Sequence, residues 1–167
     1  MRLRSLALAV LVASLAAPVF AQDDPTACWD RQEGGHPANT FLNKQMSDYW
    51  RQMLKVADPN LMGRLAGVYY AERPSPDGVY VNRQYRQFDA NGLFQYQDET
   101  CTVGGQNPCS QNQGTGEWRA ANQADGSTYL MARFSDLNRT AACFGDRITP
   151  QNGGMLDEGG VFWQRVR

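Results

Sequence analysis

One arginine and three aromatic residues are the side chains best suited to bind a ligand. Arg83 and Tyr85 share one face of a predicted strand with two valines, and Tyr96 and Trp118 lie on the more apolar faces of later strands. A guanidinium inside a folded domain must be paired or solvated, and it can receive a ligand carboxylate through two parallel hydrogen bonds. We therefore predict a ligand-binding site at Arg83, Tyr85, Tyr96 and Trp118. Two alternatives stay open: the aromatic side chains form the core, or a shift in strand register places Arg83 on the outer surface.

Residues suited to catalysis or metal binding are scarce. The chain has a single histidine, and its adjacent carboxylate pairs, Asp98-Glu99 and Asp157-Glu158, would point to opposite faces of a strand, which makes them poor partners for acid–base chemistry. We predict no catalytic residue, no metal site and no cofactor, and we favour a protein without enzymatic activity. A barrel-type cyclase or isomerase stays an alternative, because such chemistry needs only a tyrosine, an arginine and a carboxylate in one chamber.

The four cysteines indicate disulfides. No Cys-x-x-Cys pair is present, and the single histidine leaves too few ligands for a zinc site. Three pairings of four cysteines are possible. The segment between Cys101 and Cys109 contains two glycines and a proline and can fold back on itself, so we favour a bond between these two, which leaves Cys28 with Cys143.

The first 21 residues have the pattern of a secretory signal peptide. Arg2 and Arg4 precede an apolar run over residues 6–17, which is too short to span a bilayer, and a small-residue site ends at Ala21. We expect cleavage after Ala21 and a periplasmic or secreted protein without a stable membrane anchor. Removal of two of the 16 basic residues would leave a mildly acidic chain.

The composition excludes two further classes. Formal net charge is only -1 and aromatic residues make up 11% of the chain, a combination that argues against intrinsic disorder. Nucleic-acid binding is not expected, because a basic excess is lacking. The chain length is that of one globular domain.

An N-terminal helix precedes the part of the chain with strand character. Residues 22–39 are polar and rich in glycine, which predicts an irregular arm. Apolar residues then recur at three- and four-residue steps over residues 40–57, as in an amphipathic helix. Pro59 is expected to end this helix, since the residue before a proline is pushed out of helical geometry.

The remainder of the chain, residues 63–167, predicts a β-barrel. Short runs of β-branched and aromatic residues alternate with turn residues, and Asn91-Gly92 and Asp125-Gly126 are strong hairpin signals. One face of most runs is more apolar than the other. The predicted fold is mainly β. Consecutive hairpins favour an eight-stranded antiparallel up-and-down barrel over a β-sandwich. The expected strands are 64–72, 79–89, 93–101, 116–122, 128–135, 140–149, 155–156 and 161–166, with a long loop over 102–115.

Two short motifs lie at the ends of the predicted barrel: Gly67-Val68-Tyr69 on the first strand, after a helical segment, and residues 160–165 on the last. With them the chain resembles the lipocalin-like β-barrels of the calycin group. In that family a G-x-W motif packs at the closed end of the barrel under an arginine from near the C-terminus. Tyr69 stands where the tryptophan is expected, and Arg165 shares a strand face with Trp163. The resemblance implies structural roles for Tyr69, Trp163 and Arg165.

The resemblance also implies a binding function. Lipocalin-like barrels hold a small apolar or amphipathic molecule, or bind a protein, and usually catalyse no reaction. An eight-stranded barrel is just wide enough to be filled by side chains or to hold one small ligand. We expect an exported, non-enzymatic protein that binds a small hydrophobic or amphipathic molecule. An inhibitor-like module that binds a protein partner, through the arm or the loop over 102–115, is the alternative.

Overall fold

The fold was analysed in a computed structural model, which describes residues 27–30, 40–105, 109–135 and 141–166. The predicted signal peptide, residues 1–21, and most of the predicted arm lie outside the described residues. A short strand, β1 (Trp29–Asp30), is followed by two helices, α1 (Thr40–Val56) and α2 (Pro59–Leu65). The strands of the barrel come next: β2 (Gly67–Pro74), β3 (Tyr80–Phe88), β4 (Leu93–Thr102), β5 (Ser110–Asn122), β6 (Thr128–Ser135), β7 (Ala141–Gln151), β8 (Gly154–Asp157) and β9 (Phe162–Arg165).

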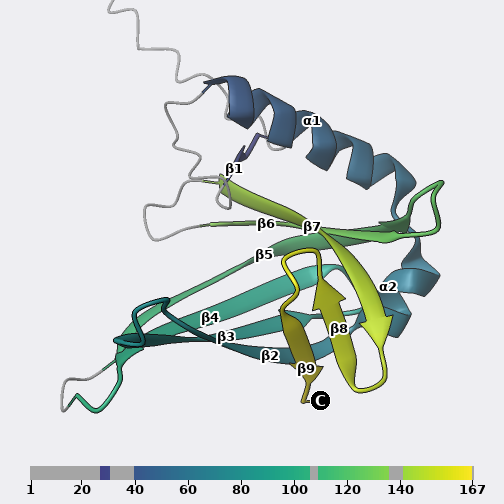
Figure 1. The fold of residues 1–167 in the computed structure, drawn as a ribbon. Coiled ribbons are helices and arrows are strands. Elements are labelled where there is room, and N and C mark those ends of the chain that lie inside the picture. The colour runs from purple at the N-terminus through teal and green to yellow at the C-terminus, as the bar shows by residue number, and fades with distance from the viewer. Residues whose placement is uncertain (1–26, 31–39, 106–108, 136–140, 167) are drawn as a thin grey trace, which may run out of the picture.

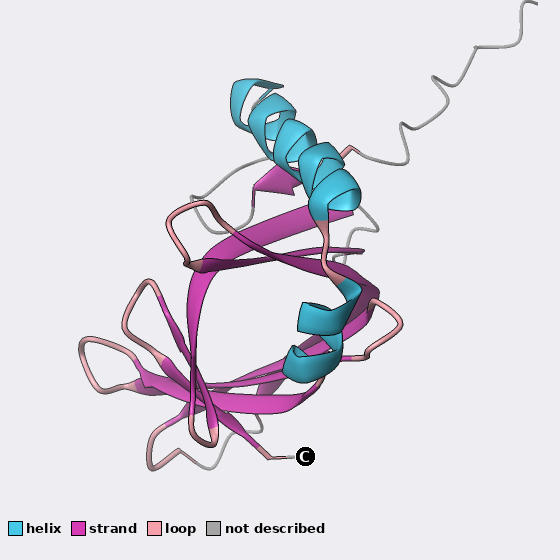
Figure 2. Ribbon diagram, turned by 90° about the vertical axis from the view of Figure 1, so that its right-hand side faces the viewer, coloured by secondary structure: helices cyan, strands magenta, loops and turns pink. Residues whose placement is uncertain are grey.

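Strands β2 to β9 form a closed antiparallel barrel. Each strand pairs with the next one in the chain, and β9 returns to pair with β2, where Tyr69 lies opposite Arg165. The ring of strands is visible in Figure 2. The predicted fold class is confirmed: a mainly β, eight-stranded up-and-down barrel preceded by one N-terminal amphipathic helix. Where β2 and β9 pair, neither strand exposes an unpaired edge to solvent.

The first helix ends before Pro59, as predicted: α1 ends at Val56, and Asp58 has an extended backbone. Three local features were not predicted. Pro59 begins a second helix, since Asp58 caps it by accepting hydrogen bonds from the backbone N–H groups of Asn60 and Leu61. Proline is well suited to the first turn of a helix, where its missing N–H leaves no unmade bond. The loop after β4 is shorter than expected, because β5 already begins at Ser110. Finally, the arm contains β1, which pairs in parallel with the start of β7.

Helix α1 packs on the outside of the barrel wall. Its Met46, Trp50 and Met53 are buried against Ala121 of β5 and Met131 of β6, in a cluster that also contains the disulfide Cys28–Cys143. Ser47 joins the helix to this disulfide by accepting from the Cys28 N–H at 3.0 Å and donating to its carbonyl at 3.2 Å. Figure 1 shows α1 lying across β5, β6 and β7, so this cluster is separate from the barrel interior.

Helix α2 covers one end of the barrel. Leu61, Met62 and Leu65 are buried in the same core cluster as Tyr69 and Trp118. The backbone N–H of Asp58 donates to the carbonyl of Ala120 at 2.9 Å, which ties the start of the helix to β5. Figure 2 shows the helix in front of the ring of strands. The interior is therefore packed with apolar side chains at the α2 end.

Two disulfides hold the fold. Cys28 is bonded to Cys143 and Cys101 to Cys109, which is the pairing favoured by the sequence. The first joins residues 115 apart and fixes β1 to β7, and the second closes the β4–β5 connection over 8 residues. None of the helices in the described ranges is both long and apolar enough to cross a membrane.

Candidate ligand site in the barrel interior

The barrel encloses a cavity of about 230 Å³. Residues that alternate along the strands point into it, so the site draws on seven of the eight barrel strands. One part of its lining is apolar and the other part is charged. The apolar residues are Phe88, Phe94, Leu130, Phe134, Phe144, Ile148 and Met155, and the polar or amphipathic ones are Arg73, Gln84, Arg86, Tyr96, Asp98, Asp146, Asp157 and Trp163.

The apolar part is built around aromatic rings. Phe94 is at the centre, with ring centroids 5.2 Å from Phe88, 5.8 Å from Phe134 and 5.7 Å from Phe144. Tyr96 lies 4.9 Å from Phe134 in an edge-to-face arrangement. Such contacts stabilise aromatic clusters beyond the burial of their area and hold the rings in fixed orientations. This part of the cavity therefore presents a rigid apolar surface to a guest molecule.

Asp157 on β8 organises the first part of the charged wall. Its side chain is only 5% exposed, and one carboxylate oxygen accepts from Arg73 at 2.9 Å and from the indole N–H of Trp163 at 3.0 Å. The other oxygen accepts the backbone N–H of Val161 at 2.7 Å. The guanidinium of Arg73 also lies over the Trp163 ring, 5.8 Å from its centroid. A buried carboxylate is tolerated only with such partners, so these bonds fix the indole in the cavity wall.

A second ion pair crosses from β3 to β4. Arg86 donates to Asp98 at 2.5 Å, and both side chains are largely buried. Its guanidinium lies over two rings, 5.6 Å from the centroid of Tyr96 and 5.3 Å from that of Trp163. Cations in a partly desolvated site are attracted to aromatic faces, so Arg86 is held by a carboxylate and two rings together.

Asp146 on β7 completes the charged wall and differs from the other two aspartates. Among the described residues, no arginine or lysine forms an ion pair with Asp146. One of its carboxylate oxygens accepts a hydrogen bond from the backbone N–H of Glu158 at 3.2 Å. Burial raises the pKa of the Asp146 carboxyl and the nearby charges of Asp157 and Glu158 raise it further, while the Glu158 backbone N–H and the charge of Arg73 oppose the rise. Charge on this carboxylate is therefore less favourable here than in water.

Two buried polar atoms of the wall have no hydrogen-bond partner among the described residues: Oε1 of Gln84, an acceptor, and Nε of Arg73, a donor. A buried polar group without a partner destabilises a folded protein by about 1–3 kcal/mol. Both atoms belong to residues that line the cavity, so its polar wall has unused capacity both to accept and to donate a hydrogen bond.

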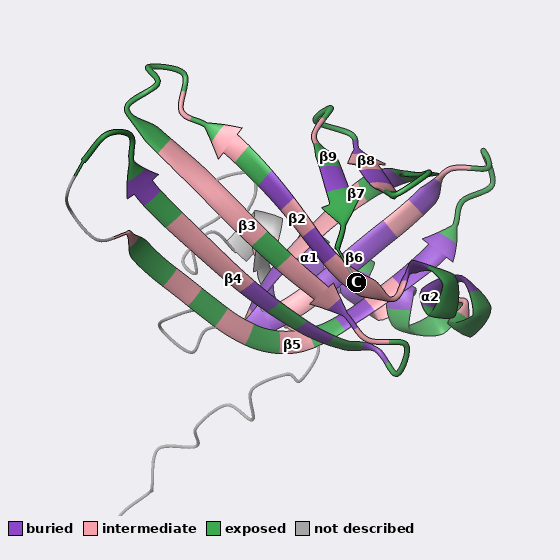
Figure 3. Cartoon of the chain, turned by 90° about the horizontal axis from the view of Figure 1, so that it is seen from below, coloured by how far each residue is buried: buried purple, intermediate pink, exposed green. Residues whose placement is uncertain are grey.

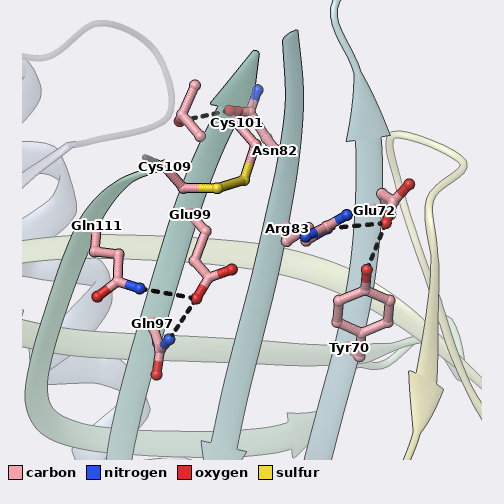
Figure 4. Close-up of a disulfide and its surroundings, with 10 residues drawn as sticks. Tyr70, Glu72, Asn82, Arg83, Gln97, Glu99, Cys101, Cys109 and Gln111 are labelled. Carbon is pink, nitrogen blue, oxygen red and sulfur yellow. Dashed lines mark hydrogen bonds and ion pairs between the residues drawn. A yellow bond between two sulfur atoms is a disulfide. The ribbon is translucent and has the colours of Figure 1, made fainter. Parts of the chain in front are cut away.

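Arg83 and Tyr85, two of the predicted ligand-binding residues, do not line this cavity. Arg83 is on the outer face of β3, where it pairs with Glu72 at 3.4 Å (Figure 4). The ring of Tyr85 packs on Tyr70, with centroids 4.9 Å apart. Pairing of β3 with both neighbours is continuous, without a bulge, so Gln84, Arg86 and Phe88 are the residues that point inward. Arg83 therefore lies on the outer surface, which is the second alternative considered for it from the sequence.

The other predicted residues are divided between the cavity and the packed end. Tyr96 lines the cavity and donates from its hydroxyl to Asn112 at 3.3 Å. Trp118 is fully buried in the core, with its indole N–H donating to the Asp89 carbonyl at 2.8 Å, and it does not contribute to the lining. Trp163, predicted to be structural, is in the cavity wall. That these residues bind a ligand stays a prediction.

Tyr69 and Arg165, the other two residues predicted to be structural, lie at the end covered by α2. The Tyr69 hydroxyl donates to the Leu65 carbonyl at 2.7 Å, and the Arg165 guanidinium donates to the carbonyls of Arg64 and Ala66. Burial raises the pKa of the Tyr69 hydroxyl, and the Arg165 charge opposes this. Both side chains thus satisfy carbonyl groups at the C-terminal end of α2, which helix geometry leaves unpaired.

The outer face of β2 to β5 contains a second, more open hollow of about 450 Å³. Its rim combines Tyr85 with neutral amides, including Gln87, Gln95, Gln97 and Gln113. Beside it, the Tyr70 hydroxyl donates to Glu72 at 2.6 Å, which raises the pKa of Tyr70 to about 12 (Figure 4). The alternation of exposed and less exposed residues along these strands can be followed in Figure 3. This hollow lies on the opposite side of the sheet from the interior cavity.

Five of the charged and amide residues of the wall were not predicted as a site: Arg73, Gln84, Arg86, Asp98 and Asp146. Strand alternation contains a signal for several of them, because Asp98 has the parity of Phe94 and Tyr96, and Asp146 has that of Phe144 and Ile148. Asp98 and Asp157 were each noted only as half of an adjacent carboxylate pair. Asp157 is the sixth such residue of the wall. Its bond with Arg73, 84 positions away in the chain, has no local signal in the sequence.

Comparison of the chain with protein-family models, with curated proteins and with solved structures gave no match.

Proposed function

We propose that this is an exported, non-enzymatic, lipocalin-like protein that binds a small amphipathic molecule inside its barrel. The observation that carries the proposal is the interior cavity, which has a rigid aromatic part and a charged part facing one space. Ligand sites in proteins combine a mostly apolar lining with a few placed polar groups in this way. The apolar part would take the body of the ligand, and the charged wall would fix its orientation.

The volume of the cavity limits the size of the ligand. An engineered apolar cavity of about 150 Å³ binds benzene in another protein. The barrel cavity is larger, at about 230 Å³, but below the roughly 300–1,000 Å³ that drug-sized ligands occupy. A molecule with one ring and a short polar side chain fits these limits. A long acyl chain or a porphyrin exceeds this volume.

Two further features support the classification. Disulfides persist in oxidising compartments, which agrees with export. The up-and-down closure of eight strands, with Tyr69 and Arg165 on paired strands at the covered end, agrees with a lipocalin-like barrel. A cyclase or isomerase chamber that uses Arg83 and Tyr85 is not formed, because both residues lie outside the cavity. Tyr96, Arg86 and Asp98 do share the cavity, so the general alternative stays open.

Displacement of a fluorescent apolar probe from the purified protein tests the proposal. We expect wild-type protein to bind the probe and Leu130→Trp, which fills the cavity, to lose at least ten-fold in affinity. Leu93→Trp is the matched control, because Leu93 is exposed on the outer face of β4. Circular dichroism would establish that both variants are folded, and Met155→Phe replaces the first variant if it is not. If the folded cavity variant and the folded Leu93→Trp control bind the probe equally well, the proposal is overturned.

A further inference from the structure

The charges around the cavity do not balance. Its lining contains two arginines and three aspartates. Arg73 is paired with Asp157 and Arg86 with Asp98, which leaves the carboxylate of Asp146 without a cation in the described part of the chain. With all five groups ionised, the wall therefore has one negative charge in excess. A ligand with one positive charge would make the site neutral.

Among the described groups that face Asp146, the positive one is Arg73, whose charge is shared with Asp157. Asp157 on β8 and Glu158 in the turn after it are both acidic, and Arg73 on β2 already donates to Asp157. Across the cavity, Arg86 and Asp98 satisfy each other. Leu130 of β6, the register partner of Asp146, contributes no charge. The carboxylate thus lies at the boundary between the aromatic part of the cavity and the charged wall.

The remaining lining also favours a cation over an anion. Aromatic faces attract positive charge, and Phe134, Phe144 and Tyr96 all border the cavity. An anionic ligand could accept from the unpartnered Nε of Arg73, but it would face three aspartates, and taking Arg86 from Asp98 would break a largely buried ion pair, which is strongly destabilising. In addition, Oε1 of Gln84 is a buried acceptor without a partner, which an N–H donor would satisfy.

We propose that the ligand of this cavity is a small organic monocation, an amine on a single apolar ring, with Asp146 as its counter-ion. This inference rests on the proposed binding function and specifies its ligand class. The ring would occupy the space between the phenylalanines, and the ammonium group would lie against the carboxylate of Asp146. The two existing ion pairs would remain intact and hold the wall in place.

Three molecules of nearly equal size and different charge test the ligand class by calorimetry on the purified protein: 2-phenylethylamine, 2-phenylethanol and phenylacetate. At pH 7 we expect the amine to bind at least ten-fold more tightly than the alcohol, and the carboxylate to bind weakest. Asp146→Asn should remove the preference for the amine and leave the affinity for the alcohol unchanged. The matched control is Asp125→Asn, which changes an aspartate in the exposed β5–β6 turn and should leave the preference as it is.

A pH series adds a measurement that needs no variant. Between pH 3.5 and pH 8 the amine stays protonated, so its affinity should rise as the Asp146 carboxyl loses its proton, whereas the affinity for the alcohol should stay constant. Equal binding of all three molecules, or tighter binding of the carboxylate, would overturn the ligand class while leaving the binding function in place. Binding of the apolar probe but of none of the three would also overturn the class. Loss of binding by the probe and all three would reject the binding function itself.

Discussion

Asp146 links the chemistry of the cavity to the stability of the fold. Because burial raises its pKa in the folded state above the value near 3.8 of the unfolded chain, the folded protein binds this proton more tightly. The contribution of Asp146 to stability therefore falls as the pH rises from 3.8 through the folded-state pKa, and it stays unfavourable at neutral pH. Asp146→Asn should raise the Tm at pH 7, by about 1–4 °C for a chain of this size.

Scanning calorimetry at two pH values checks this prediction. The gain in Tm should become much smaller at pH 3.5, where the wild-type carboxyl is mostly protonated in both states. Asp125→Asn should behave oppositely at pH 7, because bonds from Ser127 lower the pKa of Asp125. A lower Tm for Asp146→Asn at pH 7 would show that the carboxylate has a stabilising partner and would contradict the prediction.

Single residues also show where alternation along a strand misleads. On β3 the outward residues include Val81 and Tyr85, whereas Gln84 and Arg86 point inward. The more apolar face of this strand is the outer one, because its interior neighbours are the charged wall of a cavity. A rule that places apolar side chains inside therefore assigned Arg83 to the wrong face. The same rule succeeded for Tyr96, whose strand also contributes Phe94 to the cavity.

Among the elements, α1 was predictable and α2 was not. The apolar period over residues 40–57 is long enough to specify an amphipathic helix. Its buried face contains Trp50 and Met53, whereas Tyr49 and Leu54 of the same apolar pattern are exposed. The sequence around Pro59 is ambiguous, since a proline after a helix fits both its end and the first turn of another. Seven residues contain too few turns for the apolar period to decide between these possibilities.

The capping of α2 gives a prediction at this scale. Asp58 satisfies two backbone N–H groups at the start of the helix, with distances of 2.8 and 3.2 Å. Asp58→Ala should lower the free energy of unfolding by about 1 kcal/mol, and Asp58→Asn should retain most of it, because asparagine caps nearly as well. Urea denaturation of the three proteins measures both values. Equal losses in the two variants would indicate that the charge of Asp58, and not its capping bonds, stabilises the helix.

For the whole molecule, the ring of strands was predictable because it follows from local signals. Hairpin turns at Asn91-Gly92 and Asp125-Gly126 join neighbouring strands, and a chain of such hairpins closes as an up-and-down barrel. The cavity could not be predicted in this way. Its charged wall brings together Arg73 and Asp157 from the two ends of the barrel sequence, and only closure places them within 2.9 Å of each other.

The two disulfides should stabilise the molecule unequally. In the chain-entropy description, a bond between residues 115 apart constrains the unfolded chain by about 5 kcal/mol, and one between residues 8 apart by about 2.5 kcal/mol. Replacing Cys28 and Cys143 together by alanine should therefore lower the free energy of unfolding about twice as much as replacing Cys101 and Cys109. The variant without the Cys28–Cys143 bond should also lose part of the packing of α1, because Ser47 of α1 is hydrogen-bonded to the backbone of Cys28.

Urea denaturation of both double variants measures the two losses, and probe binding separates stability from function. Neither disulfide lines the interior cavity, so both variants should bind the apolar probe with wild-type affinity at temperatures where they are folded. A larger loss of stability for the 101–109 pair would mean that the unfolded chain is already constrained around residue 28. Loss of probe binding in a folded 28–143 variant would instead show that α1 and β7 control the shape of the cavity from outside the barrel, since Phe144 and Asp146 follow Cys143 on the same strand.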